Sequence, residues 1–183
     1  MKSSLIAAPV RGRSKLGSFA QQAVACTFFA ALVAVFARIS IPLPFTPIPF
    51  TLEPMAVLLA GMMLGSRAGG VALLEFLVAG ALGAPVFAGG LGSMAYLIAT
   101  PTLGYLIAYP VAAYVVGRIA ESRGAGYRRM LVAGLAGLVV IYLGGNSYLA
   151  FWLHKGALPT LLLGAAPFVV FDVIKAAIAA AVA

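Results

Sequence analysis

Long apolar runs, separated by short polar, proline-rich or glycine-rich segments, make up most of the 183-residue chain. The first run extends over about residues 19–41 and follows a polar segment, residues 1–18, that carries four basic side chains. About 20 apolar residues suffice for a helix to cross a membrane, so this run predicts a first span. A basic segment before an apolar run is also typical of a signal peptide, but the length of the run and the runs after it favour a span.

Five more hydrophobic segments follow, at about residues 52–64, 69–82, 93–120, 127–153 and 159–183, so six spans are expected. The first two are shorter than a straight span requires. The third is interrupted at Thr100-Pro101-Thr102, and Pro110 predicts a second break in it. The last is interrupted at Pro167. A proline-rich stretch, 42–49, and a glycine-rich stretch, 83–92, are predicted to be loops, the first of them a capping loop.

Composition gives the same class of protein. Hydrophobic residues make up 63% of the chain and charged residues 9%, and the mean hydropathy is +1.10. Soluble domains carry about 25% charged residues, so a soluble enzyme, a nucleic-acid-binding protein and a disordered protein are excluded. We therefore expect an all-α integral membrane protein: a basic segment, residues 1–18, and one membrane domain, residues 19–183.

The basic residues are distributed unequally between the two sides of the predicted spans. Twelve Lys and Arg stand against four Asp and Glu, a net charge of +8. With the N-terminus inside, the outer loops hold only Arg38 and Lys155. Cytoplasmic loops of membrane proteins are enriched in Lys and Arg, so both termini are predicted to be cytoplasmic. The inner side then holds Lys2, Arg11, Arg13, Lys15, Arg67, Arg118, Arg123, Arg128 and Arg129.

Asp172 and Lys175 are the most informative polar residues, because both lie in the apolar last segment. An ionisable group at mid-membrane costs about 2.5–3.5 kcal/mol on insertion scales. At spacing i,i+3 the two side chains share one face of a helix. They form either a structural ion pair or the polar floor of a ligand site that opens to the outside.

The other three acids are less informative. Glu53 is expected near the outer interface, where it would be partly hydrated. Glu75 lies within a short helix and needs a partner that the sequence does not identify. Glu121 is expected to be a solvated counter-ion of Arg118 and Arg123.

Further candidate ligand contacts lie in the outer loops and in the predicted fifth span. The glycine-rich stretch forms either a wall of a ligand site or an ordinary connector. Asn146 can donate to a ligand or bond a neighbouring helix. Tyrosines near the outer loops can stack on a ring.

The chain has one Cys and one His and contains neither a phosphate-binding Gly-x-x-x-x-Gly-Lys-[Ser/Thr] nor a His-Glu-x-x-His motif. An enzyme, a metal site and a cofactor are therefore not expected, and energy for concentrating a solute must come from a partner or an ion gradient.

Four motifs in order resemble the BioY family, the biotin-specific substrate-binding (S) components of energy-coupling-factor (ECF) transporters. They are PFTPIPFTL at 44–52, GALGAPVFAGG at 80–90, PTxGYL at 101–106 and PFxxxDxxKA at 167–176. The resemblance covers about residues 20–183. It implies a six-helix bundle in the bacterial cytoplasmic membrane, with Pro- and Gly-rich outer loops and a pocket near the outer face. It also implies docking on a transmembrane coupling protein that carries two ABC-type ATPases.

The resemblance also suggests roles for particular residues. Asp172 would accept N–H groups of the biotin ureido ring, and Lys175 would either hold the ligand carboxylate or tune Asp172. Ala30 and Ala34, four apart on the first helix, would contact the coupling protein. The remaining expected substrate-binding residues are Thr102, Tyr105, Phe87, Gly89, Gly90, Tyr148 and Asn146.

The chain departs from the family pattern at several positions. Glu53 stands where the family usually has Gln, and Leu103 where it has Gly. Val170-Phe171 replaces Pro-Gly before the aspartate, and Tyr148 stands where Trp is common. An S-component for another vitamin is therefore the first alternative. A small membrane enzyme and a purely structural helix bundle are the others.

Overall fold

The computed structural model describes residues 19–121 and 126–183. These residues form eight α-helices, one 3-10 turn and a two-stranded antiparallel ribbon. The expected basic segment, residues 1–18, lies outside the described residues, as does Arg123. The elements are α1 (Phe19–Ala37), β1 (Ser40–Ile41), β2 (Phe50–Thr51), α2 (Glu53–Leu64), α3 (Ser66–Ala81), η1 (Ala88–Gly90), α4 (Met94–Ala99), α5 (Leu103–Ala120), α6 (Tyr127–Leu153), α7 (Ala157–Gly164) and α8 (Val169–Val182).

Three of the described helices are long and apolar enough to cross a membrane: α1 with 19 residues, α5 with 18 and α6 with 27. The pair α7 and α8, bent by 55° at its break, gives a fourth if it is counted as one span. The helices α2 and α3, with 12 and 16 residues, are shorter than a straight span requires. The predicted helical membrane bundle is confirmed, whereas the number of six spans stays a prediction.

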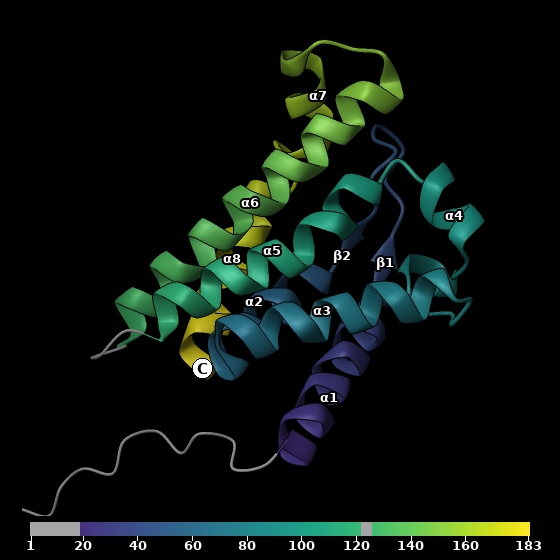
Figure 1. Cartoon of the computed structure of the whole chain (residues 1–183). Helices are drawn as coiled ribbons and strands as arrows, with labels where there is room; N and C mark the ends of the chain where they lie inside the picture. The colour runs from purple at the N-terminus through teal and green to yellow at the C-terminus, as the bar shows by residue number, and fades with distance from the viewer. Residues whose placement is uncertain (1–18, 122–125) are drawn as a thin grey trace, which may run out of the picture.

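The helix α5 lies at the centre of the bundle (Figure 1) and packs against α6, α3 and α2. The helix α8 packs on α6 and α2, and α1 lies against α3 and α2. Side chains such as Leu58, Phe76 and Val116 are fully buried where these helices meet. Outward positions are also apolar, for example Phe28 and Leu143, which is the pattern expected of helices that face lipid.

Three helix breaks were expected, two in the segment 93–120 and one in the segment 159–183, and two of the three are present. The helix α4 ends at Ala99 and α5 begins at Leu103, so the Thr100–Thr102 break is confirmed, as is the break at Pro167. The break expected at Pro110 is wrong, because α5 continues through this residue. Pro110 is buried against neighbouring helices, and such packing allows a membrane helix to tolerate a proline.

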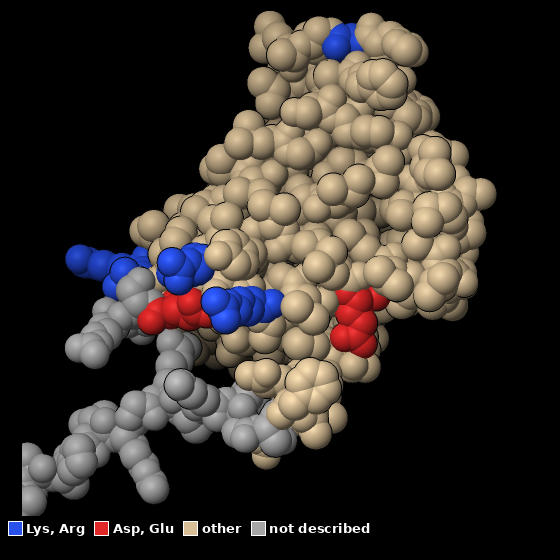
Figure 2. Space-filling view, in the orientation of Figure 1, with Lys and Arg blue, Asp and Glu red and all other residues tan. Residues whose placement is uncertain are grey.

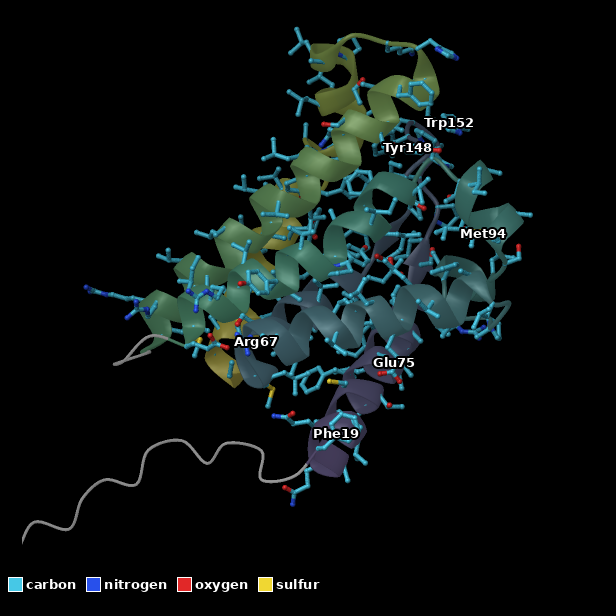
Figure 3. The ribbon with its side chains drawn as sticks, viewed as in Figure 1. Phe19, Arg67, Glu75, Met94, Tyr148 and Trp152 are labelled. Carbon is cyan, nitrogen blue, oxygen red and sulfur yellow. The ribbon has the colours of Figure 1, made fainter. Side chains whose placement is uncertain are left out.

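Basic side chains gather at one end of the molecule (Figure 2), where α5 ends and α6 begins. Arg118 lies in the last turn of α5, and Arg128 and Arg129 lie in the first turn of α6. Arg67, labelled in Figure 3, lies at the same end. Lys155, in the turn between α6 and α7, is at the opposite end. The charge asymmetry of the sequence is thus a spatial asymmetry among the described residues.

Candidate functional site

A partly open cavity of about 50 Å³, here called the inner pocket, lies between α2, α5, α6 and α8. Its polar lining comes from segments that are far apart in the sequence, from β2 and α2 to α8. Phe87 and Tyr96 supply aromatic wall from the segment between α3 and α5. The polar and aromatic lining residues are Thr51, Glu53, Phe87, Tyr96, Thr102, Tyr105, Tyr109, Tyr142, Phe168, Asp172 and Lys175.

Asp172 and Lys175 reach the inner pocket because α8 restarts just after Pro167. The bend places Asp172 in the first turn of α8, where the positive end of the helix dipole favours a carboxylate. Both residues are buried, and Lys175 Nζ donates to Asp172 Oδ1 at 2.7 Å. The shared helix face predicted from their spacing is therefore present.

The Lys175 ammonium is surrounded by groups of the protein. Its second hydrogen bond goes to the Thr51 carbonyl oxygen at 2.7 Å, and it lies 4.0 Å from the centroid of the Phe50 ring. An ammonium has three N–H groups, so at most one remains for a ligand. Of the two roles that the sequence left open for Lys175, this arrangement favours holding Asp172 and strand β2 in place.

The Asp172 carboxylate is held from two sides. Oδ1 accepts from Lys175, and Oδ2 accepts from the Tyr142 hydroxyl at 2.6 Å. Each carboxylate oxygen has a further lone pair, so Asp172 can still accept from a ligand. Tyr142 was not among the expected site residues, although its position one turn before Asn146 places both on one side of α6.

Glu53 is buried, with 4% of its surface exposed, so the expected hydrated position at the interface is wrong. The physical reason is the ribbon, which pairs Ser40 with Thr51 and folds the proline-rich loop over the start of α2. Glu53 Oε2 accepts from the Thr51 hydroxyl at 3.1 Å and from the Tyr109 hydroxyl at 3.3 Å. Glu53 and Tyr109 are thus site residues that the sequence analysis missed.

A second, larger cavity of about 580 Å³, here called the vestibule, adjoins the inner pocket. The two cavities share four lining residues: Pro49, Ala88, Tyr96 and Thr102. Arg38 is the charged residue of the vestibule lining, and its Nη2 donates to the Pro85 carbonyl oxygen at 2.6 Å. The inner pocket, with Asp172 and Lys175, thus adjoins a wider vestibule whose lining includes the cationic Arg38.

The proline-rich loop, residues 42–49, forms part of this vestibule. Pro42, Leu43 and Pro47 line it. The Thr46 hydroxyl donates to the Leu163 carbonyl oxygen at 2.8 Å, which ties the loop to α7. The expected capping loop is therefore present as a wall of the vestibule.

The glycine-rich loop positions Phe87. Gly89 and Gly90 have φ angles of 72° and 76°, a left-handed conformation that glycine adopts without strain. The resulting turn lets the Phe87 N–H donate to the Leu91 carbonyl oxygen at 2.9 Å. Phe87 stacks on Tyr96 with ring centroids 5.9 Å apart and lines the inner pocket. Gly89 lines the vestibule, and Gly90 lies against the Arg38 guanidinium.

The remaining expected site residues lie differently. Thr102 lines both cavities, and Tyr105 lines the inner pocket while its hydroxyl donates to the Gly164 carbonyl oxygen at 2.9 Å. Tyr148, labelled in Figure 3, lines neither cavity, and its hydroxyl donates to the Ile98 carbonyl oxygen of α4 at 3.1 Å. Asn146 is buried and lines neither cavity, and its amide donates to the Tyr142 carbonyl oxygen of its own helix.

The small residues expected at a coupling interface face the bundle. Ala30 is buried, and Ala34 is partly buried and packs against the same core. The exposed side of α1 carries Thr27 and Ala31 instead. In this arrangement Ala30 and Ala34 allow α1 to approach the rest of the molecule closely.

The two other glutamates have partners. Glu75 Oε1 accepts from the Thr27 hydroxyl of α1 at 2.7 Å, which supplies the partner that the sequence did not identify (Figure 3). Glu121 accepts from the Ser66 N–H at 2.7 Å and from its hydroxyl, at the start of α3. Glu121 also pairs with Arg118 at 3.8 Å, so the expected counter-ion is confirmed for Arg118, and Glu121 caps a neighbouring helix in addition.

These features define a multi-pass helical membrane protein with a pocket that contains a buried ion pair and adjoins a wider cavity. A sequence model of the BioY family matches residues 6–183. The chain belongs to the BioY family. A biotin transporter BioY of Thermotoga maritima is 39% identical over 89% of this chain and 94% of its own length. A probable biotin transporter BioY of Pyrococcus horikoshii is 40% identical over 85% of this chain and 89% of its own length.

The fold is similar to a solved structure as well. The crystal structure of an S-component for biotin from an ECF-type ABC transporter superimposes with a TM-score of 0.79 and 25% sequence identity. The match covers 89% of this chain and 88% of that one. The likeness extends over most of both chains, so the expectation of an S-component-like bundle is confirmed.

Proposed function

We propose that the protein binds biotin from outside the cell and delivers it to the cytoplasm as the S-component of an ECF transporter. The observation that carries the proposal is the Asp172 carboxylate, held by Lys175 and Tyr142 at the wall of the inner pocket. The ureido ring of biotin presents two N–H donors, and a carboxylate with free lone pairs accepts such donors strongly.

The vestibule suits the other end of the same molecule. Biotin carries a carboxylate on a flexible chain, and Arg38 lies in the vestibule wall. The bond to the Pro85 carbonyl oxygen uses one of the five N–H donors of Arg38. A ring in the inner pocket and a carboxylate at Arg38 would use both cavities. Lys175, whose donors are largely used within the protein, would not be needed for the ligand carboxylate.

The inner pocket must widen when a ligand enters. Its volume of about 50 Å³ is near that of one or two water molecules, whereas sites for small molecules usually measure about 300–1,000 Å³. The residues shared by the two cavities, among them Ala88 and Tyr96, are the boundary that must move. We infer that the loop between α3 and α4 shifts outward on binding.

Orientation and coupling are further parts of the proposal. The basic end formed by Arg67, Arg118, Arg128 and Arg129 would face the cytoplasm, which places both termini there. Energy would come from a coupling protein with two ATPases. Contact through Ala30 and Ala34 would require α1 to leave the bundle, so the exposed side of α1 with Thr27 and Ala31 is the better candidate surface.

Titration calorimetry of the full-length protein in detergent tests the proposal. Biotin should bind saturably and, at 100-fold over its dissociation constant, stabilise the protein by about 2.7 kcal/mol. Arg38→Gln should weaken biotin but leave biotin methyl ester little changed. Stabilisation by another vitamin in place of biotin would indicate a different S-component. Conversion of the ligand would indicate an enzyme, and no response to a vitamin panel a structural bundle.

A further inference from the structure

The Glu53 carboxylate has one oxygen that no group of the described protein satisfies. Glu53 Oε1 and Asn146 Oδ1 are the two fully buried side-chain oxygens without a hydrogen-bond partner within residues 19–121 and 126–183. Of these two residues only Glu53 lines the inner pocket. A buried acceptor without a partner is unfavourable, so this oxygen calls for a donor from the pocket.

The rest of the Glu53 side chain is fixed. Its other oxygen, Oε2, accepts from the hydroxyls of Thr51 and Tyr109, which come from strand β2 and helix α5. These two bonds hold the carboxylate against the pocket wall, so Oε1 cannot turn toward another donor without breaking them.

Two features of its surroundings offset part of the cost of burying the Glu53 carboxylate as an anion. Glu53 is the first residue of α2, where the positive end of the helix dipole stabilises an anion. Thr51 connects Glu53 to the ion pair of α8, because its hydroxyl donates to Glu53 and its carbonyl oxygen accepts from Lys175. One hydrogen-bonded chain therefore runs from Tyr109 through Glu53, Thr51 and Lys175 to Asp172.

We propose that Glu53 is a specificity-determining residue whose Oε1 accepts an N–H of the bound molecule. The inner pocket then presents two carboxylates from different helices, Glu53 of α2 and Asp172 of α8, to a ligand with two N–H donors. This assignment rests on the proposed function, in which that ligand is the cyclic urea of biotin. A molecule with an acceptor in place of either N–H would face a buried negative charge and be rejected.

Glu53→Gln tests the assignment, because it keeps the shape of the side chain and removes the charge. Glu75→Gln is the matched control, since Glu75 is a second glutamate of a membrane helix, bonds Thr27 and does not line the inner pocket. Hydrogen bonds to an ionised acceptor are roughly twice as strong as those to a neutral one, so biotin should bind Glu53→Gln about 5- to 30-fold more weakly than wild type. Glu75→Gln should bind within about twofold of wild type.

Biotin analogues methylated at one or the other ureido nitrogen give a second readout. Methylation removes an N–H, and at the nitrogen that faces Glu53 its penalty should be at least about fivefold smaller in Glu53→Gln than in wild type, because both changes act on the same bond and Glu53→Gln has already weakened it. At the other nitrogen the penalty should be equal in both proteins. Ligand-free melting temperatures report whether each variant is folded.

The outcomes separate the two proposals. Wild-type affinity for biotin in Glu53→Gln, or equal methylation penalties at both nitrogens in both proteins, would overturn the role of Glu53 and leave biotin binding intact. Failure of the wild-type protein itself to bind biotin would overturn the proposed function and this assignment with it.

Discussion

Two acid–base pairs with the same spacing lie in different parts of the molecule and differ in almost every other respect. At the inner pocket, Asp172 and Lys175 are 2.7 Å apart, and their side chains are 6% and 7% exposed. At the basic end, Arg118 and Glu121 are 3.8 Å apart, and their side chains are 63% and 43% exposed. Both pairs have i,i+3 spacing. Asp172 and Lys175 lie within α8, and Arg118 lies in the last turn of α5 with Glu121 directly after that helix.

The difference comes from the partners that other elements supply. Around Asp172 and Lys175, Tyr142 of α6 and Thr51 of β2 each add a second hydrogen bond, Tyr142 to Asp172 and Thr51 to Lys175. At the basic end, both carboxylate oxygens of Glu121 accept hydrogen bonds from Ser66 of α3. Arg118 Nη1 lies 3.8 Å from Glu121 Oε2, which is too far for a hydrogen bond. Spacing along a helix therefore brings charges near one another, and the tertiary surroundings decide whether they act as a unit.

The largest expected effect is that of Lys175→Met. Removal of one partner of a buried ion pair leaves an uncompensated charge, which typically costs about 3–5 kcal/mol of folding stability. Thermal unfolding in detergent should show this loss in the single variant. The double variant Asp172→Asn with Lys175→Met should regain much of it, because no lone charge remains. A single variant as stable as wild type would mean that Asp172 does not depend on its neighbour.

Asp172→Asn should have the next largest effect. It should lower folding stability, because it leaves the buried Lys175 ammonium without its counter-ion, and it should also weaken ligand binding. The amide keeps the shape but has one acceptor oxygen in place of two, while Lys175 and Tyr142 both still donate. Biotin should bind about 10- to 100-fold more weakly, a loss of about 1–3 kcal/mol. Calorimetric titration measures it. Wild-type affinity would leave only the structural ion pair as a role for these two residues.

Local sequence pattern predicted the helices well. The helix α6 extends over residues 127–153 as expected, and α2 and α3 begin and end within a few residues of the predicted segments. These helices follow from apolar runs bounded by glycine or proline, which are local features. The prediction failed at Pro110, where packing against neighbouring helices outweighs the local tendency of proline to break a helix.

The site was only partly predictable because half of it is made by long-range contacts. Asp172 and Lys175 were evident as charges in an apolar helix. Glu53 joins them only through the pairing of Ser40 with Thr51 across the proline-rich loop, and two residues per strand leave almost no periodic signal. Tyr109 stands four residues after Tyr105 and so shares its helix face, a signal that could have identified it.

Glu121→Ala should have a moderate effect that is confined to stability. Glu121 accepts from the Ser66 N–H and hydroxyl and so caps α3 from the end of α5. Loss of a helix cap typically costs about 1 kcal/mol, or about 2–4 °C in melting temperature for a chain of this size. Biotin affinity should not change, because neither residue lines a cavity. A changed affinity would show that the basic end and the inner pocket are coupled.

Arg118→Ala should have the smallest effect and gives the sharpest test of the comparison. Exposed ion pairs contribute about 0–1 kcal/mol, and here the 3.8 Å separation and the use of Glu121 by Ser66 place the value at the low end. We expect a loss below about 0.5 kcal/mol that shrinks further in high salt, since salt screens exposed charges. Measured also in the Glu121→Ala protein, Arg118→Ala should cost the same, because little interaction energy exists to lose. A coupling as large as that between Asp172 and Lys175 would mean that spacing alone, and not burial or partners, sets the strength of these pairs.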